Sequence, residues 1–316
     1  MKRFLVALSG VFVVALLVSF SGPAVAQENS PEKSPEQSEA ATRQFAAAAA
    51  LQNRKVYDLA AQEWLKFIES HKDDPRIDRA FQYLGVCYLK ENELGQAQKM
   101  FQTVLQDYPK SEMRQAAYLY LGVTQYTSAQ AGKPEMYSTA ADTFAKLIEE
   151  FPESKFLAEA LFYRGECFYA QDKKAEAAGL YQQLVQKFPE HELTDDALYA
   201  LGVSQEELGK HGEAGKTYDT FLQKYPNHEL ATEVGMRRGE TLFEQGQYQQ
   251  AAERFAAAAE AQGFALADHA LVRQAAALAQ MKKYAEAGDL YAAVSEKFPK
   301  SKNLTLANLA GGKCYY

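Results

Sequence analysis

A pattern with a period of 37 residues runs through most of this chain of 316 residues. Each unit has a small residue, which we call the anchor, and an aromatic residue follows most anchors by 16 positions. The anchors are Ala48, Gly85, Gly122, Gly165, Gly202, Gly239, Ala275 and Gly312, and the aromatics are Trp64, Phe101, Phe144, Tyr181, Tyr218, Phe255 and Tyr291. The third unit carries six extra residues before its aromatic. A repeat of this length predicts stacked units that pack only on their neighbours.

Each unit predicts two helices, because apolar residues recur at helical spacing from Thr42 onward and glycine or proline marks the ends. An alanine twelve positions after most anchors, such as Ala97, would let the two helices approach closely. The first helices are expected near 43–54, 77–91, 113–128, 155–171, 192–208, 229–245, 266–281 and 302–316. The second helices are expected near 57–71, 94–108, 134–151, 174–188, 211–225, 248–262 and 284–298.

These residue types at this spacing resemble the tetratricopeptide repeat (TPR), whose usual period is 34 residues. The second unit carries the resemblance in Leu84, Gly85, Tyr88, Ala97, Phe101 and Pro109. The resemblance covers about 275 residues and implies an all-α, right-handed solenoid of about seven and a half helical hairpins. It also implies that the first helices line a concave groove that binds proteins or peptides.

The runs 108–122 and 151–165 are similar to an envelope subgroup of that family. The subgroup includes the TolA-binding cell-division coordinator and the outer-membrane lipoprotein of the β-barrel assembly machine. The resemblance implies a periplasmic adaptor, although this chain lacks the lipoprotein's cysteine and the coordinator's coiled coil.

The first residues predict export. Residues 1–26 have a basic start, an apolar stretch and a small-residue cleavage site, which is typical of a signal peptide, and an uncleaved anchor is the alternative. Residues 27–42 are rich in Ser, Glu and Pro and predict a disordered linker before a solenoid over 43–316. No later segment is apolar enough to span a bilayer, so we expect a soluble periplasmic protein.

Charge and motifs favour a non-catalytic protein. Loss of the signal peptide leaves 32 basic and 41 acidic residues, a net charge of −9, which disfavours nucleic acid as a partner. The three cysteines occupy equivalent positions in separated units and are expected to be free. The run 209–217 resembles a phosphate-binding loop with the wrong spacing, and His191 and His228 begin incomplete zinc-protease motifs. We expect no enzyme activity, cofactor or metal.

The candidate binding residues lie on the first helices, at slots two and three before the anchor and one, four and five after it. Tyr83, Tyr120 and Tyr163 stand two before successive anchors, and Tyr126, Tyr169 and Tyr199 occupy other slots. Two interpretations remain open: the rings pack between hairpins, or they form a ladder that binds an extended or helical segment.

Carboxylates share this predicted face in the fourth to sixth units. They are Glu159, Glu166, Asp196, Glu206, Glu207, Glu233, Glu240 and Glu244, and Arg237 lies among them. They form either a solvated face or an acidic half of the groove. In the second case the partner segment should combine basic and apolar residues.

The leading hypothesis is an exported scaffold that binds partner proteins or peptides in envelope assembly or division. The alternative is the repeat portion of a longer envelope enzyme or export-machine subunit, because the sequence stops inside a first helix at Tyr316. A third hypothesis is homo-oligomerisation through the apolar last helix.

Overall fold

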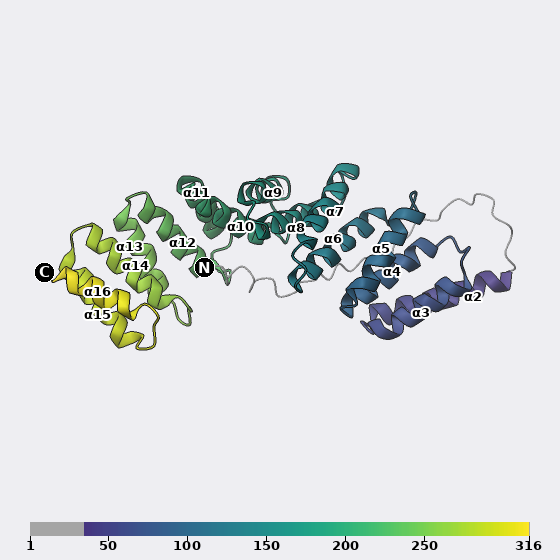
Figure 1. The fold of residues 1–316 in the computed structure, drawn as a ribbon, viewed down its shortest axis with the longest axis horizontal. Helices are drawn as coiled ribbons and strands as arrows, with labels where there is room; N and C mark the ends of the chain where they lie inside the picture. Colours follow the sequence, from purple (N-terminus) through teal and green to yellow (C-terminus); the bar gives the residue numbers. More distant parts are fainter. Residues whose placement is uncertain (1–34, 316) are drawn as a thin grey trace. The chain divides into compact units, whose positions relative to one another are not determined.

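The structure is a computed structural model that describes residues 35–315. Over this range the chain forms fifteen α-helices and no strand, labelled as in Figure 1. The helices are α2 (Pro35–Asn53), α3 (Tyr57–Ser70), α4 (Ile77–Lys90), α5 (Leu94–Asp107), α6 (Arg114–Gln130), α7 (Met136–Glu150), α8 (Leu157–Ala170), α9 (Lys174–Lys187), α10 (Thr194–Glu207), α11 (His211–Lys224), α12 (Ala231–Glu244), α13 (Tyr248–Glu260), α14 (Ala267–Gln280), α15 (Tyr284–Lys297) and α16 (Leu304–Cys314).

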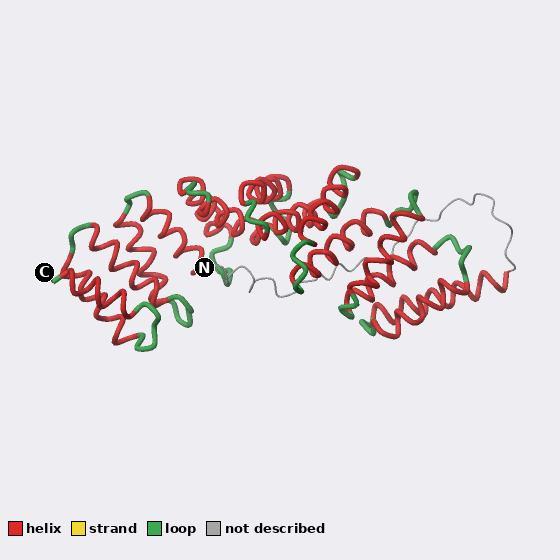
Figure 2. Tube along the Cα trace, viewed as in Figure 1, coloured by secondary structure: helices red, strands yellow, loops and turns green. Residues whose placement is uncertain are grey.

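Each helix from α3 onward packs on its neighbours in sequence, through short turns that are visible in Figure 2. The first helices α4, α6 and α8 also contact one another across successive hairpins. The predicted all-α solenoid of TPR-like hairpins is therefore confirmed. Every predicted helix after the first lies within two residues of its observed bounds.

The first helix differs from the prediction. It begins at Pro35, inside the segment 27–42 for which the sequence predicts a disordered linker. Proline suits the first position of a helix, and Glu39, Ala40 and Ala41 favour helix formation. The predicted signal peptide, residues 1–26, lies outside the described residues. None of the helices within 35–315 has the length and apolarity to cross a membrane.

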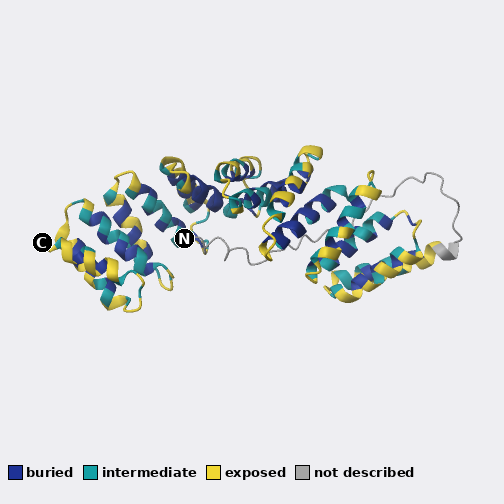
Figure 3. Cartoon of the chain, viewed as in Figure 1, coloured by how far each residue is buried: buried dark blue, intermediate teal, exposed yellow. Residues whose placement is uncertain are grey.

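The anchor glycines seat the core aromatics. A Cβ atom built on Gly85 would stand 2.6 Å from the ring of Phe101, and one on Gly165 would stand 2.6 Å from the ring of Tyr181. The same ring-on-glycine contact joins Gly122 to Phe144, Gly202 to Tyr218 and Gly239 to Phe255. These rings are fully buried. Buried positions alternate with exposed ones along the helices (Figure 3). The anchor is small because the aromatic of its own hairpin lies directly on it.

Most turns between hairpins contain the same hydrogen bond from a backbone N–H to a side chain. The residue eleven positions before the anchor accepts a hydrogen bond from the backbone N–H two residues later, as Ser111 does from Met113 (2.9 Å). The residues in this role are Asp74, Ser111, Ser154, His191, His228 and Ser301. Such local side-chain bonds satisfy backbone donors just before a helix begins. His191 and His228 therefore order turns, and neither belongs to a zinc-protease motif.

The contact of the ring with the anchor glycine predicts that alanine has opposite effects at two glycines of one hairpin. Gly165→Ala should lower the free energy of unfolding by about 1–3 kcal/mol, because the methyl group overlaps the Tyr181 ring. Gly179→Ala, in α9, meets nothing within 4 Å and should raise it by up to about 1 kcal/mol through helix propensity. Thermal and urea unfolding would measure both changes. Equal effects of the two substitutions would contradict the requirement for glycine beneath the Tyr181 ring.

Candidate functional site

We call the side chains six and two positions before the anchor and one, four and five after it the first-helix face. Its three predicted ladder tyrosines are half-buried. The Tyr120 ring stacks on Phe101 at 5.8 Å between centroids, and Tyr163 stacks on Phe144 at 5.9 Å. Tyr83 lies 5.3 Å from Trp64 in a tilted arrangement. Each tyrosine therefore covers the core aromatic of the preceding hairpin with one surface, which favours the packing interpretation and leaves part of each residue accessible.

Two other predicted rings are less accessible. Tyr199 and Tyr126 are buried, with 3% and 9% of their surface exposed. The prediction that the slot three before the anchor is exposed is wrong in five hairpins, where Gln82, Leu119, Tyr199, Met236 and Val272 are buried. Adjacent residues of a helix point about 100° apart, so this slot and the slot two before the anchor have different surroundings. The remaining occupants differ: Phe45 and Phe162 are half-buried, and Leu309 is exposed.

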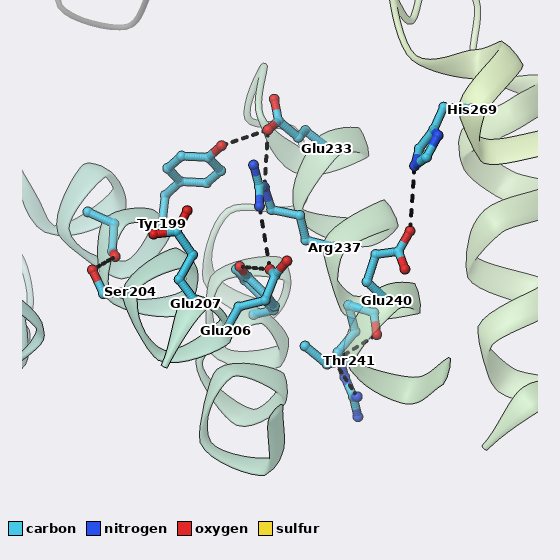
Figure 4. A network of polar contacts seen from close by, with 12 residues as sticks. Tyr199, Ser204, Glu206, Glu207, Glu233, Arg237, Glu240, Thr241 and His269 are labelled. Carbon is cyan, nitrogen blue, oxygen red and sulfur yellow. Dashed lines mark hydrogen bonds and ion pairs between the residues drawn. The ribbon is translucent and has the colours of Figure 1, made fainter. Parts of the chain in front are cut away.

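The face becomes polar around Arg237 (Figure 4). Its Nε lies 3.2 Å from Glu233 Oε1, and its Nη1 lies 3.4 Å from Glu206 Oε2. The hydroxyl of Tyr199 donates to Glu233 (2.6 Å), and that of Tyr218 donates to Glu206 (2.7 Å). One guanidinium thus neutralises two carboxylates from neighbouring hairpins, α10 and α12.

A second arginine occupies the same slot one hairpin later. Arg273, in α14, makes a bidentate contact with Glu240 and lies 4.2 Å from the centre of the Phe243 ring. His269 Nε2 lies 3.7 Å from Oε1 of the same carboxylate (Figure 4). Burial opposes ionisation here, but hydrogen bonds from His269 and Arg273 hold the pKa of Glu240 below its ordinary value.

Glu166 of the fourth hairpin and Asp196 of the fifth have a different environment. Glu166 accepts a hydrogen bond from Tyr181 (2.7 Å) and lies 3.5 Å from the Tyr126 hydroxyl. Burial raises the pKa of Glu166, and the nearby Asp196 carboxylate raises it further. Burial, Asp195 and Glu229 together raise the pKa of Asp196 to about 6. Within residues 35–315, no Lys, Arg or His nitrogen lies within 4.0 Å of either carboxylate.

The predicted acidic half is therefore largely paired from within the chain. Tyr169 donates to Glu207 (3.0 Å), which also lies 3.1 Å from Lys174. Sequence reasoning named the carboxylates but missed Arg273 and the core tyrosines as their partners. The register contains the signal, because a residue one after an anchor and a residue two before the next anchor lie in contact, as Glu240 and Arg273 do.

Three other features of the sequence remain: possible metal ligands, the cysteines and the run 209–217. No group of three His, Cys, Asp or Glu side chains within 35–315 could hold a metal ion. Cys87 and Cys167 are buried free thiols, as predicted, and burial raises the pKa of Cys87 to about 12. The run 209–217 spans the turn between α10 and α11 and the start of α11.

Comparison with protein families agrees with this architecture. Two family models described as "Tetratricopeptide repeat" match residues 159–191, 196–228 and 236–302. The chain is a TPR protein. A third model, described as "Outer membrane lipoprotein", matches residues 37–166 of this TPR protein. No curated protein matches the chain significantly.

Solved TPR structures share the fold at low sequence identity. The C-terminal part of a TPR protein from Cytophaga hutchinsonii has a TM-score of 0.64 and 17% identity, and the match covers 83% of this chain and 98% of that one. YrrB, described as "a TPR protein with an unusual peptide-binding site", has a TM-score of 0.53 and 21% identity, with coverages of 66% and 98%. PilF of Pseudomonas aeruginosa has a TM-score of 0.50 and 18% identity, with coverages of 73% and 96%. At these identities the matches show the fold alone.

The raised pKa of Asp196 predicts a stability change that depends on pH. Its pKa lies above the ordinary value of an aspartate, so this carboxyl stabilises the fold at low pH and that contribution is lost as the pH rises through about 6. Asp196→Asn should raise the free energy of unfolding by about 1–3 kcal/mol at pH 7.5 and change it little at pH 4.

Urea unfolding at the two pH values measures this difference. Asp142→Asn, on the exposed surface of α7, is the matched control and should be neutral at both pH values. A change of equal size at pH 4 and pH 7.5 would contradict the electrostatic cause.

Proposed function

We propose that this TPR protein is a non-catalytic scaffold of the cell envelope that binds a segment of a partner protein along its first-helix face. The observation that carries the proposal is the repeated placement of partly accessible rings and carboxylates in equivalent slots of successive first helices. The core aromatics hold these side chains at fixed spacing, so a long segment could be bound with little ordering of the scaffold.

The comparisons support the location and the class of activity. The N-terminal repeats match an outer membrane lipoprotein family, and TPR proteins bind proteins or peptides in general. The signal-like residues 1–26 favour export to the periplasm. Families of this kind are typically scaffolds without catalytic activity.

The chemistry of the face defines the partner. We expect apolar side chains of the segment to contact the ladder tyrosines Tyr83, Tyr120 and Tyr163, with Tyr126 behind them. Basic side chains should lie near Glu166, Tyr169, Glu206 and Glu240, although Arg237 and Arg273 already pair with the last two carboxylates. Tyr199 is buried and would act by holding Glu233 in place.

Crosslinking tests this proposal. Replacing Tyr120 by the photoreactive p-benzoyl-phenylalanine keeps an aromatic ring on Phe101, whereas alanine would remove the stacking contact and destabilise the hairpin. After irradiation of envelope fractions, we expect a partner peptide to be attached at position 120 and identified by mass spectrometry.

The control carries the same group at Asp142, which is exposed on the second helix of that hairpin. Equal capture from positions 120 and 142, or capture from 142 alone, would contradict binding on the first-helix face. A crosslink between two copies of the chain would instead indicate homo-oligomerisation.

A further inference from the structure

Two sites at equivalent positions of the first-helix face differ in whether the chain supplies an arginine to them. In the sixth and seventh hairpins, Glu240 pairs with Arg273 between the rings of Phe243 and Phe255. The guanidinium carbon of Arg273 lies 4.2 Å from the Phe243 centroid and 5.6 Å from the Phe255 centroid. This arrangement is a carboxylate and two aromatic rings that together hold a guanidinium of the same chain.

The fourth and fifth hairpins contain the same arrangement without the arginine. Glu166 and Glu240 each stand one position after an anchor, Tyr169 and Phe243 four after, and Tyr181 and Phe255 sixteen after. Arg273 stands two before the next anchor, and the corresponding residue is Ala200. Ala200 packs in the same cluster as Tyr181 and Tyr169, so it occupies the expected place.

The contact between the fifth and sixth hairpins also has an arginine in this slot. Arg237 also stands two before its anchor, and it pairs with Glu206 of the preceding hairpin, to which Tyr218 donates. Its guanidinium carbon lies 5.5 Å from the Tyr199 ring. Both arginines in this slot therefore meet a carboxylate of the preceding hairpin and a nearby ring.

The fourth hairpin site also carries additional negative charge. Asp196 occupies the slot that His269 fills in the seventh hairpin, six before the anchor. Glu166, Tyr169 and Asp196 each keep part of their surface exposed. One Glu166 oxygen accepts a hydrogen bond from Tyr181, and among the described residues the other has only the 3.5 Å contact with the Tyr126 hydroxyl.

We propose that Glu166, Asp196, Tyr169 and Tyr181, beside Ala200, bind an arginine side chain of the partner segment. The bound arginine would take the place at Glu166 that Arg273 of the chain itself takes at Glu240. An arginine fits better than a lysine, because a planar guanidinium can pair with a carboxylate and stack on a ring at once. The inference rests on the proposed function, since it names the partner side chain that the first-helix face recognises.

The probe is Nα-acetyl-arginine N-methylamide. Its binding is measured by NMR, from the chemical shifts of the backbone amides of the full chain. The probe is titrated up to about 50 mM, because one ion pair with ring contacts corresponds to roughly millimolar affinity. We expect saturable shifts in residues 163–169 and 196–200. The neutral citrulline derivative should cause none, and the lysine derivative should bind at least about tenfold more weakly.

Two variants remove the site by different means. Glu166→Gln keeps the side-chain shape and removes its charge, and Ala200→Arg supplies the missing guanidinium from within the chain. Both should abolish the shifts. Glu176→Gln, an exposed carboxylate on α9 of the same hairpin, is the matched control and should bind like the unaltered chain.

Arg273→Ala provides a positive control for the probe, because it opens a second site around Glu240 with a carboxylate and two rings in the same slots. Shifts near Glu240 without shifts near Glu166 would overturn the proposal, as would unchanged binding in Glu166→Gln or equal binding of the citrulline derivative. No shift at either site at the highest concentration would overturn it as well.

The two proposals fail separately. Capture of a segment from position 120 without arginine binding at Glu166 would refute only the arginine site. Arginine binding without any captured segment would refute only the scaffold function.

Discussion

The contact of an aromatic ring with an anchor glycine organises this solenoid. The ring of Phe101 lies where a side chain on Gly85 would have to be, and the same pair recurs in four further hairpins. Because glycine removes the Cβ atom, the two helices of a hairpin cross at the thickness of one ring. Three of the core rings, Trp64, Phe101 and Phe144, also contact the tyrosine two before the next anchor, as Phe101 contacts Tyr120. One contact therefore determines how closely the two helices of a hairpin approach. In those three hairpins it also positions the residue two before the anchor of the next hairpin.

That dependence explains why the same slot can carry different chemistry. A tyrosine extends the apolar stack towards the surface, as Tyr120 and Tyr163 do. Arg273 lies near the same kind of ring, Phe255, and Arg237 lies over Tyr199. Each arginine brings a charge, which requires a carboxylate nearby because a partly buried charge without a partner is costly. Glu206 and Glu240 fulfil that requirement for Arg237 and Arg273. The substitution of one slot thus converts an apolar face into a polar one without changing the scaffold.

The fold was predictable because its signal repeats. Small anchors, core aromatics and turn prolines recur at a fixed spacing, so an error in one unit is corrected by the others. The start of α2 was missed because it precedes the first unit, where local composition was the only guide. The burial of Tyr199 was missed for another reason: a sequence pattern gives the angle of a side chain about its own helix, but not which neighbouring hairpin covers it.

The site was only partly predictable, since its pairs join residues of adjacent hairpins. The sequence names Glu166 and Glu240 as equivalent by register, yet their environments are opposite. Hydrogen bonds from His269 and Arg273 lower the pKa of Glu240, whereas burial and Asp196 raise that of Glu166. The difference arises from two replacements in the following hairpin, Ala200 for arginine and Asp196 for histidine. A carboxylate held in a ring-lined position without its cation costs folding free energy, because its charge is desolvated and uncompensated. Binding a cation would recover that cost at the moment of association, so a partner's positive charge gains more at Glu166 than at a carboxylate that an arginine of the chain already neutralises.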